Sequence, residues 1–412
     1  MEEIDKLFER GTVVEVFPSK EVLVQAFQAG KKLKIYFGAD PTGSALHIGH
    51  AKNLIFLEEL RQLGHEVIVL FGDFTARIGD PDKSAARKQL TAEEVKSNVS
   101  GWLKQVSSIV DFTDKKNPAK VMYNSAWLSK LTLSDVVNLA SNFTVQQMLE
   151  RDMFAKRMKE GTPIHLHEFL YPIMQGYDSV AMDVDAELCG TDQIFNALAG
   201  RTLMKRLKNK DKFVIALNLV ANPKTGELMS KSNGTGVFID STPNDLFGSI
   251  MALPDPMIEP LFLNCTRIPM TEKDALIAQG PREAKARIAF DIVRRFHGEV
   301  MARSAEESFN KTFAKGGVPE DVAEVKIGST AGSVNANSLV DALIKAGIVP
   351  SKTEWRRLID AGAVTAVDVV SGVASVTSVV GGKDEKISDP LWKPTKTTVL
   401  KIGKRRFVKV VV

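Results

Sequence analysis

Two histidines flank Ile48 and Gly49 in the segment "ADPTGSALHIGH". The segment "KLKIYFG" before it is typical of a β-strand, and "AKNLIFLEELRQLGH" after it has apolar residues at helical spacing. His47 and His50 are therefore expected at or near the first turn of a helix. Helix starts favour phosphate, and imidazoles there can donate hydrogen bonds to a phosphate that gains charge during reaction. Taken alone, the pair could equally be a turn residue and a cap.

A second segment of phosphate-binding type is "ELMSKSNGTG", which contains Lys231 and Ser232. Its glycines allow the loop to close, and a mobile lysine can pair with the leaving phosphates of a nucleotide. A Lys-Ser loop is more often a solvated turn, so this interpretation depends on the histidines upstream. The sequence has no G-x-x-x-x-G-K-[ST], and a P-loop site is not expected.

Three polar side chains share one face of a third segment, "HEFLYPIMQGYDSV". Tyr171, Gln175 and Asp178 stand at i, i+4 and i+7, a spacing that aligns them along a helix. Such a stripe either recognises a ligand or is a partly solvated face.

The elements that must position these residues alternate between strands and helices over the first 220 residues. Strand-like segments at 32–38, 65–73 and 212–220 are separated by helical patterns. This alternation predicts an α/β fold with a Rossmann-like, doubly wound parallel sheet, which binds ligands beyond the carboxyl ends of its strands. A largely helical stretch at about 90–182 is interpreted as an insertion.

The 412 residues predict more than one domain. We expect a catalytic domain over 1–235, a helical domain over 236–315, a linker over 316–337 and a small C-terminal domain over 338–412.

Composition narrows the class of protein. The chain is 44% hydrophobic and 25% charged with a net charge of +4, which is ordinary for a globular protein. Two cysteines make neither a disulfide framework nor a zinc site, and "HLH" at 165–167 lacks a third ligand nearby. Neither a targeting segment nor a membrane span is visible. We therefore expect a cytoplasmic protein with no membrane partner and no protein-bound metal.

Jointly, "HIGH" and "MSKS" resemble the signature pair of class I aminoacyl-tRNA synthetases. The ordered segments "YFGADPTGSALHIGH", "IGDP", "LYPIMQGYD", "GTDQ" and "MSKS" resemble the bacterial-type tyrosyl-tRNA synthetases, over nearly the whole chain. The resemblance implies that L-tyrosine is activated by ATP with Mg²⁺ and then transferred to the 3′ end of tRNA(Tyr). It also implies a homodimer formed through the helical insertion.

The resemblance further implies a role for each matching residue. At the substrate tyrosine it implies Tyr36 and Asp178 for the phenol hydroxyl, Asp80, Tyr171 and Gln175 for the α-ammonium, and Gln193 near the carboxylate. At ATP it implies Gly38, Asp40, Thr42, Gly49, Gly190, Asp192 and Lys231. The catalytic set is His47, His50, Lys231 and Ser232, with Lys83 and Arg87 in a basic loop whose spacing is one residue short of the common pattern. Phenylalanine would leave Tyr36 and Asp178 unpaired, and this family is the known example of that mode of rejection.

Two positions depart from the family pattern. Leu228 stands where the signature has its first lysine, so one pyrophosphate contact is absent or comes from another residue, such as Lys224. Cys189 replaces a glycine, with little expected consequence because cysteine is small.

The C-terminal segments "SLVDALIKAGIVPSKTEWRRLIDAGAV" and "VLKIGKRRFVKV" resemble a small RNA-binding domain first known from a ribosomal protein. Clustered basic side chains suit a phosphate backbone. The candidates for RNA contact are Lys352, Arg356, Arg357, Lys404, Arg405 and Arg406.

Three alternatives remain open. A tryptophanyl enzyme shares the fold, although Tyr36 and Asp178 suit a hydroxyl better than an indole. A small adenylyltransferase would need neither "LYPIMQGYD" nor a basic tail. A non-catalytic RNA-binding relative is conceivable because of Leu228.

Overall fold

The computed structural model describes residues 2–80, 90–229, 236–314, 322–327, 336–367, 385–395, 397–403 and 406–412. It contains two compact units, Met1–Ala302 and Arg303–Val412. The residues in the expected site that lie outside the described ranges are Lys83, Arg87, Lys231, Ser232, Lys404 and Arg405.

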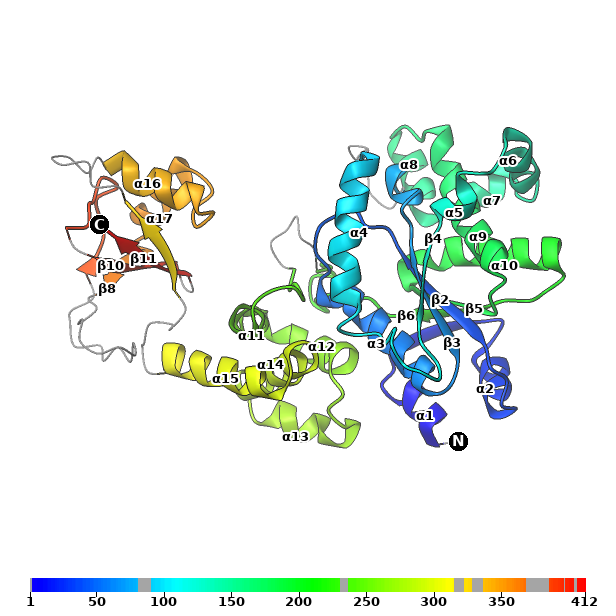
Figure 1. Cartoon of the computed structure of the whole chain (residues 1–412), viewed down its shortest axis with the longest axis horizontal. Coiled ribbons are helices and arrows are strands. Elements are labelled where there is room, and N and C mark those ends of the chain that lie inside the picture. The colour runs from blue at the N-terminus through cyan, green and yellow to red at the C-terminus, as the bar shows by residue number, and fades with distance from the viewer. Residues whose placement is uncertain are drawn as a thin grey trace. The chain divides into compact units, whose positions relative to one another are not determined.

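The first unit is built on a six-stranded sheet with the strand order β1-β6-β5-β2-β3-β4 (Figure 1). The edge strand β1 runs antiparallel to β6, and the other neighbours are parallel. The expected α/β fold with a doubly wound sheet is therefore confirmed, and three of its strands match the segments expected from sequence. The strands are β1 (Val13–Phe17), β2 (Lys34–Ala39), β3 (Glu66–Phe71), β4 (Lys120–Tyr123), β5 (Ala186–Gly190) and β6 (Phe213–Leu217).

The strand order reverses between β2 and β5. From β2 the chain continues outward through β3 to β4, whereas β5 returns to the other side of β2 and leads to β6. In doubly wound sheets a crevice opens beyond the carboxyl ends of the strands at such a switch point. Here these ends lead into Asp40 on one side and Asp192 on the other.

Helices cover the sheet and connect its strands. The α-helices up to β6 are α1 (Glu2–Glu9), α2 (Lys20–Gln28), α3 (Ile48–Gln62), α4 (Ala92–Val106), α5 (Ser125–Leu128), α6 (Leu133–Ala140), α7 (Val145–Leu149), α8 (Asp152–Glu160), α9 (Leu170–Met182) and α10 (Ile194–Lys208). Short 3-10 helices occur at Thr75–Arg77, Leu166–Phe169 and Thr191–Gln193. The insertion expected at 90–182 is mostly helical, but it also contains β4, which extends the sheet beyond β3.

Alternation along β2 sends Tyr36 to the face of the sheet that α9 covers. Tyr36 packs with Ile68 and Leu70 of β3 and with Met182 at the end of α9. Successive strand residues point to opposite faces, so Ile35 and Phe37, which are also buried, point the other way. The sheet thereby buries one tyrosine among apolar side chains, close to its own carboxyl edge.

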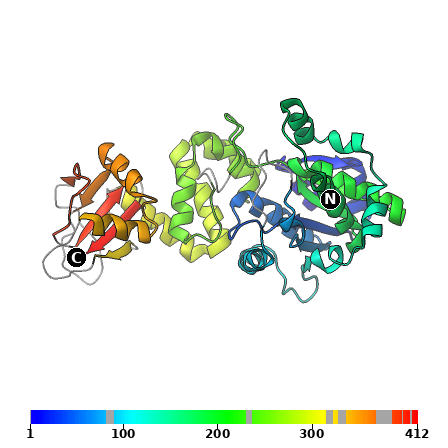
Figure 2. The same cartoon turned by 90° about the horizontal axis from the view of Figure 1, so that it is seen from above.

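Residues 243–297 form a group of helices within the first unit (Figure 2). They are α11 (Pro243–Ala252), α12 (Ile258–Cys265), α13 (Lys273–Ala278) and α14 (Pro281–His297), with 3-10 turns at Asp255–Met257 and Met270–Glu272. The next helix, α15 (Glu299–Ala314), contains the boundary between the two units. Arg10 connects the end of α12 to the N-terminal part of the chain. Its guanidinium donates to the carbonyls of Leu263 and Ile268, 2.9 Å away in each case. Helix α12 also packs on α3.

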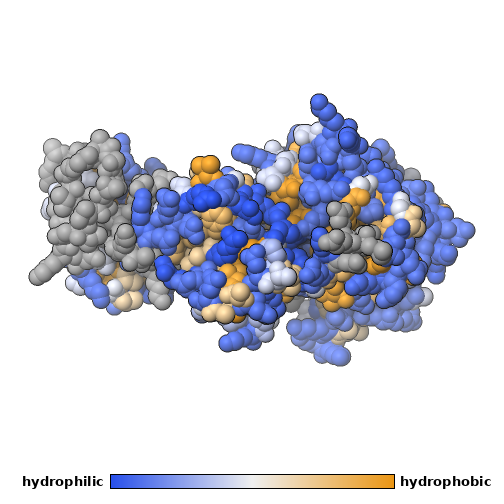
Figure 3. Space-filling view, turned by 90° about the horizontal axis from the view of Figure 1, so that it is seen from below, coloured by the Kyte–Doolittle hydropathy of each residue, from blue (hydrophilic) through white to orange (hydrophobic). Residues whose placement is uncertain are grey.

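The surface in Figure 3 is mostly hydrophilic, with hydrophobic residues in scattered patches, as is usual for folded proteins. Within the described ranges, no single helix has the length and apolar character to cross a membrane; only α11 with the segment Asp255–Cys265 passes that test jointly, across a 111° bend.

The second unit is a five-stranded sheet with the order β7-β11-β10-β8-β9, covered by α16 (Ala336–Lys345) and α17 (Lys352–Asp360). Its strands are β7 (Ala323–Lys326), β8 (Val364–Val367), β9 (Glu385–Lys386), β10 (Thr398–Ile402) and β11 (Arg406–Val411). Trp355 is buried in its core, and the indole N–H donates to the Pro390 carbonyl at 3.1 Å. The range 316–337, interpreted as a linker, contains β7, which pairs in parallel with β11. That strand belongs to the small domain.

Candidate active site

A cavity of about 940 Å³ opens at the switch point between β2 and β5. It gathers residues that are up to about 200 positions apart in the chain, from Tyr36 to Phe238. The expected site residues that line it are Tyr36, Gly38, Asp40, Thr42, His47, Gly49, His50, Asp80, Tyr171, Gln175, Asp178, Gly190, Asp192 and Gln193. Every described residue expected at the tyrosine and at ATP therefore borders this one cavity; Lys231, also expected at ATP, lies outside the described residues.

The histidine turn lies at the start of α3, as expected. His47 is the N-cap residue of the helix, and its ring centroid is 3.8 Å from that of His50. Gly49 is needed there, because a Cβ atom at this position would lie 2.8 Å from Nδ1 of His47. The two imidazoles thus lie in contact, with their planes tilted by 33°, at the positive end of a helix dipole.

Helix α4 holds the backbone of the turn before the histidines. The Trp102 indole N–H donates to the Gly43 carbonyl at 2.7 Å, and the Leu46 N–H donates to Gln105 Oε1 at 2.7 Å. Asn98 donates to the Pro41 carbonyl at 2.9 Å. Three hydrogen bonds from one helix thereby fix the segment between β2 and α3.

The buried end of the cavity holds Tyr36 and Asp178, which are 1% and 3% exposed. Asp178 accepts a hydrogen bond from the indole N–H of Trp127 at 2.7 Å and one from the amide of Asn124 at 3.3 Å. The Tyr36 hydroxyl lies 3.1 Å from Ser179 Oγ. A hydroxyl and a carboxylate thus both border the buried part of the cavity, which suits a ligand that carries one hydroxyl on an aromatic ring.

Burial shapes the protonation of both groups. It raises the pKa of Tyr36 well above its ordinary value, and the charges of Glu187 and Asp178 raise it further. It also raises the pKa of Asp178, against the hydrogen bonds from Trp127 and Asn124, which lower it. Tyr36 therefore keeps its proton and can serve as a donor.

A chain of hydrogen bonds crosses the middle of the cavity. Gln193 Nε2 donates to Asp80 Oδ2 at 2.7 Å, and Asp80 Oδ1 accepts from Arg151 at 2.7 Å. The amide of Asn196 donates to Gln193 Oε1 at 2.9 Å and to Gln175 Oε1 at 3.0 Å. Amide and carboxylate oxygens thus converge from β5, α9 and the segment after β3, a set that suits a cationic amine.

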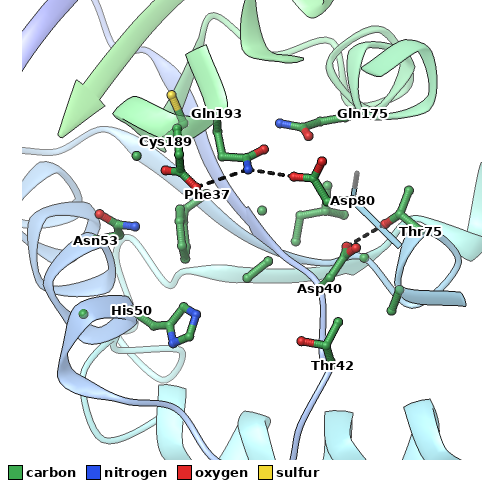
Figure 4. A pocket seen from close by; sticks show the side chains of 18 of the residues that line it. Phe37, Asp40, Thr42, His50, Asn53, Thr75, Asp80, Gln175, Cys189 and Gln193 are labelled. Atoms are coloured by element: carbon green, nitrogen blue, oxygen red, sulfur yellow. Dashed lines mark hydrogen bonds between the residues drawn. The ribbon is translucent and has the colours of Figure 1, made fainter. Parts of the chain in front are cut away.

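Asp40 joins the two halves of the site. Its Oδ1 accepts from Thr75 at 2.7 Å, and its Oδ2 accepts from the Tyr171 hydroxyl at 2.9 Å. In Figure 4, Asp40 lies beside Thr75 on the same side of the cavity as Asp80, and His50 lies opposite. One end of the cavity therefore presents imidazoles and a helix start, and the other presents groups that suit a polar aromatic molecule.

His50 is neutral at physiological pH. Burial, with a smaller contribution from the nearby His47 and Lys52, lowers its pKa to about 3. Its Nδ1 is buried and has no hydrogen-bond partner within the described ranges. A neutral imidazole still donates one N–H and can stabilise a phosphate that gains negative charge.

The sequence interpretation missed several residues of the site, namely Lys52, Thr75, Asn124, Trp127, Arg151, Glu187 and Asn196. Asn124 and Trp127 directly follow β4, so they share the edge of the sheet at which the other strands end. Recognition of the four-residue strand would have identified them, but it lies in a stretch interpreted as helical. Arg151, Glu187 and Asn196 had no such signal, because single polar residues inside helices and strands are common.

The two departures lie at the rim and the wall of the cavity. Leu228 is 46% exposed, borders the cavity and forms an isolated bridge with Ala221. Cys189 is buried in β5 beside Ala197. No group of three potential metal ligands occurs within the ranges that the structure describes.

The basic candidates of the small domain are on its surface. Lys352, Arg356 and Arg357 lie on α17 and are exposed, and Arg406 is exposed at the start of β11. Arg357 is held by Glu354 through two bonds of 2.8 Å, and Lys352 pairs with Asp341 at 2.8 Å. No ion pair of Arg356 occurs within the described part of the chain.

Comparisons with known proteins agree with this geometry. The model of the family described as class I tRNA synthetases (W and Y) matches residues 28–314. A tyrosine–tRNA ligase of Carboxydothermus hydrogenoformans is 40% identical, over 98% of this chain and 97% of that protein. One from Thermotoga maritima is 36% identical, over 99% and 97%. A solved structure of a C-terminally truncated mitochondrial tyrosyl-tRNA synthetase of Aspergillus nidulans has a similar fold, with a TM-score of 0.64, 23% identity, and coverage of 76% of this chain and 94% of that one.

Proposed function

Because this chain belongs to the tyrosyl-tRNA synthetases of class I, which activate tyrosine with ATP and transfer it to tRNA(Tyr), we propose that the cavity between β2 and β5 is where the activation occurs. The observation that carries this assignment is that one cavity has a buried hydroxyl and carboxylate at one end and two neighbouring histidines at a helix start at the other. The tyrosine carboxylate attacks the α-phosphate of ATP, and pyrophosphate leaves. A carboxylate is already nucleophilic, so catalysis here is positioning and charge stabilisation.

At the tyrosine, Tyr36 donates to the phenol oxygen and Asp178 accepts the phenol proton. Their burial supports this role, because phenylalanine offers Tyr36 no phenol oxygen and Asp178 no phenol proton, and both groups would lose that hydrogen bond in a buried site. Asp80, Tyr171 and Gln175 bind the α-ammonium, and Gln193 lies near the carboxylate. The convergence of the Asp80 and Gln175 oxygens supports this division of roles.

At ATP, the nucleotide binds along the turns that contain Gly38, Asp40, Thr42 and Gly49, and its ribose contacts Gly190 and Asp192. His47 and His50 donate to the α-phosphate as its charge increases. Mg²⁺ enters as part of the substrate, held by the phosphates of ATP, a mode that is common for this ion.

Lys231 and Ser232, with Lys83 and Arg87, bind the pyrophosphate end. The residues beyond the Lys231 segment support this proposal: the Ile48 N–H donates to the Val237 carbonyl at 2.9 Å, and His47 forms a bridge with Phe238. The chain thus leaves the lysine segment directly against the histidine turn.

The small domain binds tRNA through Lys352, Arg356, Arg357, Lys404, Arg405 and Arg406. Two copies of the chain associate through the helical insertion, which exposes several large apolar side chains to solvent. These include Leu133, Val137 and Val145, which are 80%, 59% and 65% exposed. Because the reaction consumes tRNA and ATP, we place the protein in the cytoplasm.

Pyrophosphate exchange with ATP tests the assignment of the cavity. The wild-type chain should support exchange with tyrosine and not with phenylalanine or tryptophan. Tyr36→Phe should raise the KM for tyrosine while the KM for ATP stays the same. An unchanged KM for tyrosine would place the phenol site elsewhere.

A further inference from the structure

A buried ion pair lies behind the tyrosine end of the cavity. Lys212 is 0% exposed and Glu187 is 2% exposed, and the ammonium donates to the carboxylate. Glu187 lies opposite Tyr36 in the β2–β5 register and borders the cavity, whereas Lys212 precedes β6 and does not line it. A fully buried pair is costly to desolvate and does little for stability by itself, so its presence beside a substrate pocket calls for another explanation.

The glutamate end of the pair orients Gln175. Gln175 Nε2 donates to Glu187 Oε1 at 3.0 Å, and the carboxylate can only accept. The amide of Gln175 is therefore fixed with its nitrogen towards Glu187. Its oxygen, which accepts from Asn196 at 3.0 Å, keeps a second lone pair for another donor.

The lysine end of the pair orients Tyr36. Lys212 Nζ donates to Ser179 Oγ at 2.9 Å, and an ammonium cannot accept. Ser179 is thus an acceptor towards Lys212, and its own hydrogen is available for the Tyr36 oxygen, 3.1 Å away. The hydroxyl hydrogen of Tyr36 is then left for a different acceptor, either the Glu187 carboxylate, with which Tyr36 also forms a side-chain hydrogen bond, or the phenol oxygen of a bound tyrosine.

The packing of α9 on α10 leaves room for this arrangement. A Cβ atom on Gly200 would lie 2.6 Å from Lys212 Nζ and 2.8 Å from Ser179 Oγ. Only a residue without a side chain allows the ammonium to reach the serine from beneath α10.

We propose that the Lys212–Glu187 pair is a positioning device that sets hydrogen-bond direction at both ends of the tyrosine pocket. Through Glu187 and Gln175 it presents an oxygen to the α-ammonium, and through Ser179 and Tyr36 it presents a proton to the phenol oxygen. The inference rests on the proposed roles of Tyr36 and Gln175, and it adds Glu187, Lys212 and Ser179 as residues that act through them.

Ser179→Ala tests the phenol arm by removal of a single oxygen atom. We expect the KM for tyrosine in pyrophosphate exchange to rise about fivefold, the size of one ordinary hydrogen bond. The inhibition constant of phenylalanine should stay the same, because phenylalanine has no hydroxyl for Tyr36 to meet. If Ser179 had a purely structural role, its loss would weaken the binding of tyrosine and of phenylalanine alike. That result, or no change in the binding of either, overturns the inference.

Glu187→Gln tests the ammonium arm, because a glutamine at 187 no longer dictates which way Gln175 points. The KM for tyrosine should rise about tenfold or more. The inhibition constant of 3-(4-hydroxyphenyl)propanoate, which lacks the amine, should not change; equal weakening of both overturns this arm. Glu58→Gln is the matched control, because Glu58 forms a buried ion pair with Arg61 away from the cavity.

Gly200→Ala displaces the ammonium without removing its charge and should reproduce the effect of Ser179→Ala. Tyr36→Phe distinguishes the role of the ion pair from the proposed role of Tyr36 itself. If Tyr36→Phe alters selection between tyrosine and phenylalanine but Ser179→Ala does not, the ion-pair inference fails and the proposed function stands. If neither alters selection, the proposed role of Tyr36 fails as well.

Discussion

The Tyr171 hydroxyl donates to Asp40 Oδ2 across 2.9 Å, so helix α9 is bonded directly to the turn after β2. Tyr171 belongs to the proposed tyrosine site and Asp40 to the proposed ATP site. This single hydrogen bond therefore connects the two proposed substrate sites directly.

Tyr171→Phe should weaken the binding of both tyrosine and ATP. Loss of a hydrogen bond to a carboxylate has a cost of about 1.5–3 kcal/mol, so the KM for tyrosine should rise at least about tenfold. The KM for ATP should also rise, by a smaller factor, because Thr75 still holds Asp40. Separate titrations of the two substrates in pyrophosphate exchange measure this. Tyr177→Phe, on the same helix, is the matched control and should change neither value.

Trp127→Phe should make the use of tyrosine more sensitive to acid. Burial raises the pKa of Asp178, and the Trp127 hydrogen bond lowers it, so removal of the indole raises the pKa further. A protonated Asp178 no longer accepts the substrate hydroxyl as a carboxylate does. The acid limb of kcat/KM for tyrosine should therefore move to higher pH. Trp355→Phe in the other unit should leave the profile in place, and a shift to lower pH would contradict the prediction.

Protonation of His50 should make the fold less stable in acid, whereas near neutral pH the ring stays unprotonated. Its pKa is lowered to about 3 in the folded chain, whereas an unfolded histidine titrates near 6.5. Between these values the unfolded chain binds the extra proton, so stability is present above about pH 6.5 and is lost as the pH falls below it.

Urea unfolding at several pH values between 4.5 and 8 measures this effect. The wild type should lose up to about 1.4 kcal/mol per pH unit more than His50→Gln below pH 6.5. His167→Gln, at an exposed ring, serves as the control. Parallel curves for wild type and His50→Gln would show that the ring protonates normally in the folded chain.

Leu228→Lys should raise the rate of tyrosyl-adenylate formation. The side chain borders the cavity and is 46% exposed, so a lysine there can reach the phosphates without burial of its charge. One recovered interaction of about 1.4 kcal/mol in the transition state gives a tenfold gain. Single-turnover measurement of adenylate formation, with Leu228→Met as the neutral control, tests it. A lower or unchanged rate would mean that another residue, such as Lys224, already supplies the contact.

Arg356→Ala should weaken the binding of tRNA more than Arg357→Ala does, because Arg357 is already paired with Glu354. For Arg356→Ala, the KM for tRNA should rise and the slope of its logarithm against log salt should fall by about one. Exchange of pyrophosphate, which does not involve tRNA, should be unchanged in both variants. Equal effects of the two substitutions would mean that tRNA displaces Glu354.

Much of the fold was predictable because its signals are local. Strands β2, β3 and β6 are continuous apolar runs, and the start of α3 at His47 follows from the change of hydrophobic period. The helices α16 and α17 were visible for the same reason. Strand β4 was missed because four residues between helical patterns have no period of their own. Strand β7 was missed because its four residues lie in a Gly- and Ser-rich stretch.

By itself, the sequence determined which chemical groups the site contains and where along the chain they stand. It placed His47 at a helix start and aligned Tyr171, Gln175 and Asp178, because helical spacing decides which side chains share a face. Only the tertiary structure decided their partners. Trp127 donates to Asp178, 51 positions away in the chain, and Tyr171 donates to Asp40, 131 positions away. Lys212, just before β6, contacts Glu187 on the neighbouring strand β5. These contacts depend on strand order and on helix packing, which no local pattern in the chain encodes.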